Sequence, residues 1–330
     1  MNKYIKSAIV TLLLTVALCA SLVACDNSTT PADTQSPSDT TAEVVTNEAG
    51  EVVTQAPTGN ENTTPGNTDP SSITLTFNGT ACTPSVADAV TVEGNAYVIS
   101  KAGTYVLTGD LTGGQIKVAA AKTDEVILVF KNFNASNPTS APLYIDSCNK
   151  CIIELAAGSV NTLTDAETYV FADPTKDKPN ACIYSGDDLT IRGEGTLNVV
   201  GNYNNGIGCK NDLRIKSGTI NVSAPNNILK GNDSVTIEGG VITLEGGEDA
   251  IKSDTTDRTD KGFILIDGDA KVTITCADDA LQATQSITVA AGTSVTITAG
   301  GNAVNCPGTI NADETAMNIL AEKSEDTTAQ

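Results

Sequence analysis

The sequence predicts an all-β protein, a parallel β-helix with three short strands in each coil and about 22–24 residues per coil. Three observations predict this fold. Apolar residues recur at a nearly constant interval through the second half of the chain, alternating apolar pairs follow each of them, and glycines stand at the expected corners. A hairpin sandwich would not hold a fixed three-strand period, whereas coils stacked along an axis do.

One set of apolar residues marks the first strand of each coil. It comprises Ile183, Ile207, Leu229, Ile251, Leu281 and Val304, at intervals of 24, 22, 22, 30 and 23 residues. The long interval contains an insertion, TTDRTDK at residues 255–261, after which the pattern resumes. Because one coil cannot bury its apolar face alone, we expect equivalent residues of neighbouring coils to pair about 4.8 Å apart along the axis.

Two more strands follow in each coil, each marked by apolar residues that alternate with polar ones. The second strand carries Leu189/Ile191, Leu213/Ile215, Val235/Ile237, Ile264/Ile266 and Ile287/Val289. The third carries Leu197/Val199, Ile220/Val222, Ile242/Leu244, Val272/Ile274 and Val295/Ile297. The upstream segments YVLTGDLTGGQIKVAAAKTDEVILVFKNFNA and LYIDSCNKCIIEL fit looser coils behind an N-terminal cap.

The chain is expected to have four parts, of which the coils form one. Residues 1–24 read as a signal peptide, because Lys3 and Lys6 precede a short apolar run. Leu-Val-Ala-Cys, ending at Cys25, resembles a bacterial lipobox, which implies cleavage before Cys25 and its lipidation; the alternative is an ordinary signal peptide. Residues 25–72 are poor in apolar residues and are expected to be a disordered linker. The β-helix domain is expected at 73–322, followed by a frayed tail at 323–330. We therefore expect a lipid-anchored protein on the extracellular face of a bacterial membrane.

Composition excludes several kinds of chemistry. The chain has no His, which excludes Ser-His-Asp and Cys-His catalysis and His-ligated metals. It also has no Trp, which excludes the Trp platforms that many sugar binders use. Its formal net charge of −21 argues against a nucleic-acid partner, since phosphate binding requires a basic face. Cys148 and Cys151 form a lone C-x-x-C, for which we favour small apolar core residues over a zinc or redox site.

Polar pairs at one corner of each coil suggest a metal site. Their first members are Asn180, Asn204, Asn226, Glu248, Asp278 and Gly301, and their second members are Ala181, Asn205, Asn227, Asp249, Asp279 and Asn302. If Asp249 and Asp279 stack one coil apart, two carboxylates roughly 5 Å apart repel by about 1 to 3 kcal/mol. A shared proton or a cation would offset this repulsion.

Ca²⁺ is the expected cation, because it takes oxygen ligands from carboxylates and amides. The candidate ligands are Glu248, Asp249, Asp278, Asp279, Asn227 and Asp254. For Asn204, Asn205, Asn226 and Asn227 we favour a hydrogen-bonded amide ladder that needs no metal. Asp257 and Asp260 in the insertion, and Asp165, Asp173 and Asp177 in an upstream acidic loop, are weaker candidates for cation ligands.

Several segments carry a family resemblance. NACIYSGDDLTIRGEGTLNVVG, NNGIGCKNDLRIKSGTINV, NNILKGNDSVTIEGGVITLEGGEDAIKSD and DDALQ resemble the carbohydrate-binding β-helix lipoproteins of clostridial cell surfaces, which are related to the pectate lyases. The resemblance covers roughly residues 75–305. It implies a right-handed β-helix, bound Ca²⁺, and binding to cellulose or pectin. The Asn-Asn corners depart from the Asp-Asp pairs that this family often has, which puts the number of calcium sites in doubt.

Candidate residues for the sugar are Tyr184, Tyr203, Lys210, Lys230 and Lys252, which we expect on the outer surface or one flank of the coils. Lys230 and Lys252 should stack with Gln282. In a lyase they would serve as the base, since there is no His; the plainer interpretation is that they are solvated lysines balancing the acidic corners.

The sequence therefore predicts a monomeric surface lipoprotein that binds plant cell-wall polysaccharide without catalysis, assisted by calcium. The alternatives are a calcium-dependent pectate-lyase-like enzyme and a structural adhesin or stalk.

Overall fold

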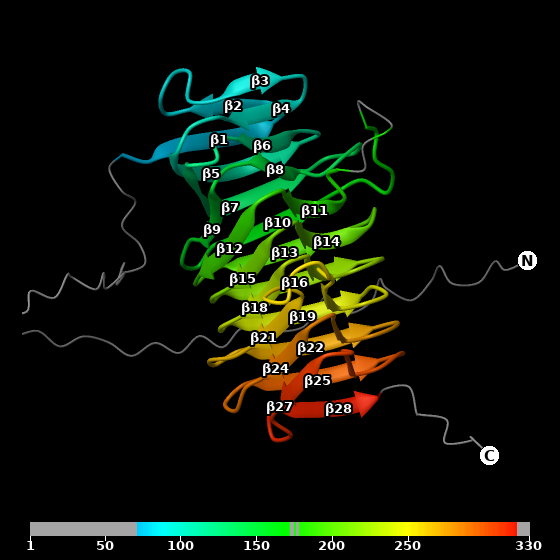
Figure 1. The fold of residues 1–330 in the computed structure, drawn as a ribbon. Coiled ribbons are helices and arrows are strands. Elements are labelled where there is room, and N and C mark those ends of the chain that lie inside the picture. The colour runs from blue at the N-terminus through cyan, green and yellow to red at the C-terminus, as the bar shows by residue number, and fades with distance from the viewer. Residues whose placement is uncertain (1–70, 172–174, 176–177, 322–330) are drawn as a thin grey trace, which may run out of the picture. The chain divides into compact units, whose positions relative to one another are not determined.

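The computed structural model describes residues 71–171, 175 and 178–321. The predicted signal peptide, Cys25, nearly all of the predicted linker and the tail from residue 322 lie outside the described residues. Within the described part of the chain all regular elements are strands, and no helix long and apolar enough to cross a membrane occurs there. Figure 1 shows the strands stacked as successive coils from the cyan N-terminal end to the red C-terminal end.

The first strand of each coil belongs to a ten-stranded sheet, with the order β26-β23-β20-β17-β14-β11-β8-β6-β4-β3. All of its pairings are parallel except that of β3 with β4. Its strands are β3 (Thr91–Glu93), β4 (Ala96–Ile99), β6 (Gln115–Ala119), β8 (Leu143–Ser147), β11 (Ala181–Ser185), β14 (Asn205–Cys209), β17 (Leu229–Gly231), β20 (Ile251–Ser253), β23 (Leu281–Ala283) and β26 (Val304–Asn305).

The second and third strands of the coils form an 18-stranded sheet. Its two columns are joined at one long strand, β7, which pairs with both β9 and β10. One column holds β9 (Lys150–Leu155), β12 (Asp188–Gly193), β15 (Asp212–Ile215), β18 (Ser234–Ile237), β21 (Phe263–Ile266), β24 (Ser286–Val289) and β27 (Thr309–Ala312). The other holds β10 (Val160–Thr164), β13 (Thr196–Val200), β16 (Thr219–Ala224), β19 (Val241–Gly246), β22 (Lys271–Cys276), β25 (Ser294–Ala299) and β28 (Met317–Ala321).

The observed register confirms the predicted period. Ile183 pairs with Ile207, Ile207 with Leu229, Leu229 with Ile251, Ile251 with Leu281, and Leu281 with Val304. The 30-residue interval is accommodated by a loop between β20 and β21, so Val235 still pairs with Ile264. The fold is thus the expected all-β parallel β-helix, because each apolar column continues through every coil.

The N-terminal end differs from the repeating coils. There β1 (Ile73–Gly79) pairs antiparallel with β2 (Ala81–Pro84), and β1 also pairs in parallel with β5 (Gly103–Thr112). The long strand β7 (Glu125–Ser136) follows. Aromatic rings fill the core here, with Phe77 centred 5.3 Å from Phe133, which is itself 5.3 Å from Phe130. The two antiparallel pairs, β1–β2 and β3–β4, form the expected cap over the first coils.

Small residues complete the core. Cys148 and Cys151 are both fully buried, and the seven cysteines from Cys82 onward are all free thiols. Burial raises the pKa of the Cys148 thiol to about 12 and that of Cys151 well above its ordinary value. These two residues are therefore packing groups, as the composition indicated.

Candidate functional site

The outward face of the ten-stranded sheet carries one continuous column of polar and aromatic side chains. Strand pairing places its members in the order Lys117, Tyr144, Tyr184, Gly208, Lys230, Lys252, Gln282 and Asn305. The predicted stacking of Lys230, Lys252 and Gln282 is confirmed, because these three residues follow the inward-facing Leu229, Ile251 and Leu281. We call this set the front column.

The two stacked lysines are each held by a carboxylate. Lys230 Nζ lies 2.7 Å from Asp254 Oδ2, and Lys252 Nζ lies 2.8 Å from Asp249 Oδ2. The first acid is partly exposed, whereas the Asp249 side chain is only 7% exposed. The structure therefore supplies a counter-ion for Asp249 from within the chain, three residues along.

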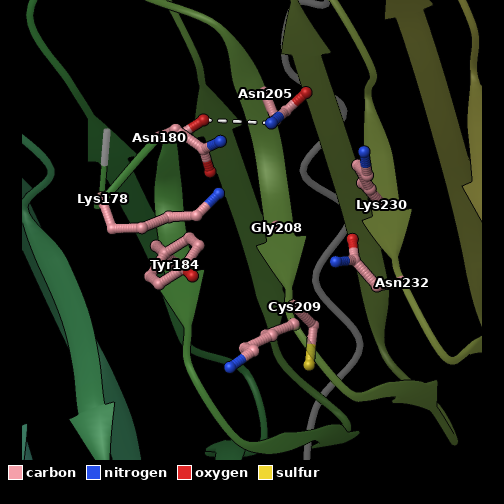
Figure 2. Close-up of a pocket in the computed structure, with 9 residues that line it drawn as sticks. Lys178, Asn180, Tyr184, Asn205, Gly208, Cys209, Lys230 and Asn232 are labelled. Atoms are coloured by element: carbon pink, nitrogen blue, oxygen red, sulfur yellow. Dashed lines mark hydrogen bonds between the residues drawn. The ribbon is translucent and has the colours of Figure 1, made fainter. Parts of the chain in front are cut away.

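Gly208 interrupts the front column and opens a hollow in it (Figure 2). The space in and above the hollow, open solvent included, is about 310 Å³. It is lined by Lys178, Asn180, Tyr184, Asn205, Gly208, Cys209, Lys210, Lys230 and Asn232. A side chain on Gly208 would begin to fill it, since a Cβ there would lie 3.0 Å from the Ala181 Cβ and 3.6 Å from Tyr184 Cδ2.

The tyrosines predicted to bind sugar occupy two different environments. Tyr184 forms one wall of the hollow; its ring lies 5.8 Å from that of Tyr144, and Lys178 Nζ lies 5.4 Å from its centroid (Figure 2). Tyr203 stacks on Tyr169 at 4.1 Å, in a separate cluster that includes Phe171. Tyr184 thus lines a site, whereas Tyr203 packs against neighbouring aromatic rings.

Asp165, the described acid of the predicted upstream loop site, makes hydrogen bonds within the protein. Asp165 accepts hydrogen bonds from the Tyr169 hydroxyl at 2.6 Å and from the Asn202 backbone at 2.5 Å. Burial raises its pKa, although these hydrogen bonds oppose the shift. The other two acids of the predicted loop site, Asp173 and Asp177, lie outside the described residues.

The corner beside the front column contains the predicted amide ladder. Asn227 Nδ2 donates to Asn205 Oδ1 at 2.8 Å, and Asn205 Nδ2 donates to the Asn180 carbonyl at 3.1 Å. A parallel outer ladder joins Asn226 Nδ2 to Asn204 Oδ1 at 2.6 Å. In both ladders the amide nitrogen donates toward the N-terminal end of the stack, and the oxygens of Asn204 and Asn205 accept from the next coil.

The ladder changes character at the next coil, where Asp249 replaces asparagine. Asp249 and Asp279 are stacked as predicted, since the Asp279 backbone N–H donates to Asp249 Oδ1 at 3.3 Å. Asp279 accepts four side-chain and backbone hydrogen bonds, from Asn305, Asn302 and Gln282. Burial alone would raise the pKa of Asp279, but these donors together hold it below its ordinary value.

One buried oxygen lacks a partner at this junction. Asn227 is 5% exposed, and its Oδ1 atom has no hydrogen-bond partner among the residues that the structure describes. The ladder suggests a reason: in the next coil the position of an amide side chain is taken by the Asp249 side chain, which offers only acceptors when ionised. The strand register stacks Asp249 one coil after Asn227, and a buried amide oxygen next in line to a carboxylate is a pair of oxygen ligands that a cation could stabilise.

The other predicted ligands do not gather around one ion. Glu248 and Asp278 are exposed neighbours, linked by a backbone hydrogen bond of 2.8 Å, and Asp254 holds Lys230. Across residues 71–171, 175 and 178–321 no group of three or more acidic or cysteine side chains is placed to hold a metal. A calcium site at Asn227 and Asp249 would therefore rely on amide and backbone oxygens as well as carboxylates.

The insertion at residues 255–261 supplies cations to two acids of earlier coils, Asp212 and Asp233. Lys261 Nζ lies 2.7 Å from Asp212 Oδ2, and Arg258 pairs with Asp233. Asp212 has a lowered pKa, because hydrogen bonds from Lys261 and Ser234 outweigh the effect of burial. Asp257 and Asp260 remain exposed.

A second shallow groove of about 590 Å³ lies along the outward face of β13, β16 and β19. It is lined mainly by Asn198, Asn221, Thr243, Val200 and Glu245, and Asn221 Nδ2 donates to Asn198 Oδ1 at 2.9 Å. This groove carries a carboxylate and no basic side chain, in contrast to the hollow at Gly208.

Sequence reasoning missed part of the hollow. Lys178, Asn180, Gly208 and Asn232 were not predicted as sugar-binding residues. The signal was present for Gly208, because the register that aligns Lys230 with Lys252 also places a glycine one coil earlier.

Stacked coils with a continuous outward column define an extended solenoid surface suited to a polymeric ligand. Comparison with known proteins gives the family: the model for carbohydrate-binding domain-containing proteins matches residues 93–328, and this chain belongs to that family. A carbohydrate-binding domain-containing protein of Acetivibrio thermocellus is 42% identical over 235 residues, covering 71% of this chain and 82% of the relative.

A solved structure agrees with the fold. The polysaccharide lyase-like protein from C. thermocellum, described as a gadolinium derivative, superposes with a TM-score of 0.73 at 42% identity. The match covers 76% of this chain and 100% of that one. The predicted resemblance to carbohydrate-binding, lyase-like β-helices is confirmed.

Proposed function

We propose that this chain binds plant cell-wall polysaccharide, cellulose or pectin, at the bacterial surface, without catalysis and with the assistance of calcium. The front column carries the proposal, because it presents aromatic, amide and cationic groups in a straight row across successive coils. Family membership supplies the ligand class, a carbohydrate. Lipidation at Cys25 would hold the domain at the outer face of the membrane.

The contacts of the two stacked lysines favour binding over lyase chemistry. A lyase base must accept a proton, which requires an uncharged amine. Lys230 and Lys252 are instead engaged in ion pairs with carboxylates, at 2.7 and 2.8 Å. We therefore assign them to the binding surface and not to proton abstraction.

Calcium is proposed at the junction of Asn227 and Asp249. The unpartnered Asn227 Oδ1 and the Asp249 carboxylate are oxygen ligands of the kind that Ca²⁺ takes. Lys252 Nζ competes for the same carboxylate, so the ion would replace an ammonium contact. The description of the solved relative as a gadolinium derivative adds support, because gadolinium is also a hard cation.

Affinity electrophoresis in gels containing pectin or soluble cellulose derivatives, with Ca²⁺ or with EDTA, tests the proposal. We expect retardation by at least one polymer, and stronger retardation with Ca²⁺. Failure of both polymers to retard the protein would contradict polysaccharide binding and favour the adhesin alternative. Release of unsaturated product from polygalacturonate, followed by ultraviolet absorbance, would show instead that the protein is a lyase.

A further inference from the structure

The hollow at Gly208 is lined by basic side chains, although the chain as a whole is acidic. Among the residues that the structure describes, its lining contains Lys178, Lys210 and Lys230 and no Asp or Glu. The chain as a whole has 40 acidic and only 19 basic residues. A concave site with basic and no acidic side chains on such a protein is suited to an anion.

Two of these lysines differ from most others near the front column. In the part of the chain that the structure describes, neither Lys178 nor Lys210 makes an ion pair. Lys230, Lys252 and Lys261 all have carboxylate partners within 2.8 Å. The charges of Lys178 and Lys210 are therefore available to a ligand, whereas the others balance the acids of the protein.

The remaining lining groups suit a sugar that carries the anion. Asn180, Asn205 and Asn232 bring amide groups to the rim, and the Tyr184 ring forms a wall. Figure 2 shows Lys178 alongside Tyr184 on one side of Gly208, with Lys230 and Asn232 on the other. Hydroxyl groups would bond to the amides while the anionic group lies between the lysines.

We propose that this hollow is a subsite for the carboxylate of a uronic acid residue within an acidic polysaccharide. This rests on the proposed function and specifies its ligand. The local field of the lysines offsets the repulsion that a polyanion meets from a chain with a net charge of −21. Recognition is direct, through ammonium groups, and does not require the calcium ion proposed at Asn227.

The test compares the double variant Lys178→Met/Lys210→Met with the control Lys131→Met/Lys271→Met, whose lysines are exposed and lie outside the hollow. Affinity electrophoresis is run on polygalacturonate, on its fully methyl-esterified form, and on a soluble cellulose derivative, all in EDTA. For the hollow variant we expect about a tenfold loss of affinity for polygalacturonate, from two charged contacts of about 0.7 kcal/mol each. Binding to the two neutral polymers should not change.

A second variant, Gly208→Leu, fills the hollow without changing charge and should give the same selective loss, with melting temperature as the check on folding. Equal losses for the hollow and control variants, or for charged and esterified polymer, would overturn the subsite. So would a wild-type protein that binds only the neutral polymers, a result that leaves the proposed function intact. If the wild type binds none of the polymers in EDTA, the subsite fails; the proposed function fails with it only if binding is also absent when Ca²⁺ is present.

Discussion

The same corner of the β-helix is built in two ways. At Asn205 and Asn227, each amide donates a hydrogen bond toward the preceding coil, and Asn205 also accepts from Asn227; the ladder ends at Asn227 Oδ1, which has no partner among the described residues. At Asp249 and Asp279 the side chains only accept, and their charge is balanced by Lys252 and by amides reaching from Gln282, Asn302 and Asn305. The amides of a ladder therefore hydrogen-bond to one another, whereas stacked carboxylates need donors and cations from outside the column. A bound ion could supply the positive charge that these carboxylates need.

The largest effect should come from removing the cation beside Asp249. Lys252→Met leaves a carboxylate that is 7% exposed without its counter-ion. We expect a loss of about 3 kcal/mol in the free energy of unfolding at pH 7, measured by urea denaturation. If calcium binds at this junction, it should restore more stability to this variant than to the wild type.

Lys230→Met is the matched control, because it removes the neighbouring lysine of the same column. Its partner Asp254 is 36% exposed, so water screens the charge that remains. The expected loss is below about 1 kcal/mol. Equal losses for the two variants would show that burial of the acid does not distinguish the two pairs.

The amide side of the comparison is tested by Asn205→Ala. This change removes the acceptor for both the Asn227 backbone N–H and Asn227 Nδ2, and leaves them buried. We expect a loss of about 2 kcal/mol by urea denaturation. Asn204→Ala in the half-exposed outer ladder should cost less than about 1 kcal/mol, and a reversed order would contradict the account of the inner ladder.

The period of the sequence predicted most of this architecture. Because side chains in a strand alternate, aligning Leu229 with Ile251 also fixed the pairing of Lys230 with Lys252. Aligning Ile251 with Leu281 likewise stacked Asp249 on Asp279. The insertion did not hide the pattern, since the strands on both sides of it kept their register.

The period did not predict which side chains contact the stacked residues. The lysine that holds Asp249 lies three residues along the chain and reaches back to it, which depends on side-chain rotamers. The hollow joins Lys178, from the segment before β11, to Gly208 and Asn232 in later coils. Sequence predicted the columns, but not which side chains reach across between them.

Asp249→Asn would extend the amide ladder by one coil. Its new Nδ2 group can donate to the unpartnered Asn227 Oδ1, and its Oδ1 still accepts from the Asp279 backbone. Because Lys252 is 25% exposed and can turn to solvent, we expect a gain of about 1 kcal/mol by urea denaturation, with loss of any calcium-induced rise in melting temperature. Asp254→Asn is the control and should change stability by less than about 0.5 kcal/mol. A loss of stability in Asp249→Asn would mean that the carboxylate is needed where it stands.

The smallest effect concerns acid stability, and it separates Asp279 from Asp165. The donors around Asp279 hold its pKa below the ordinary value of 3.8, so its stabilising contribution is complete above that pH and is lost as the pH falls through the folded pKa. Burial raises the pKa of Asp165, so its contribution has the opposite sign: it is complete below 3.8 and falls as the pH rises toward the folded pKa.

Melting temperatures measured from pH 6 to pH 2.5 should therefore fall less steeply below pH 4 for Asp279→Asn than for the wild type. Asp165→Asn should steepen the decline over the window just above 3.8, because the wild type gains stability there on acidification. Parallel curves for all three proteins would show that neither carboxyl has a different pKa in the folded and unfolded chain.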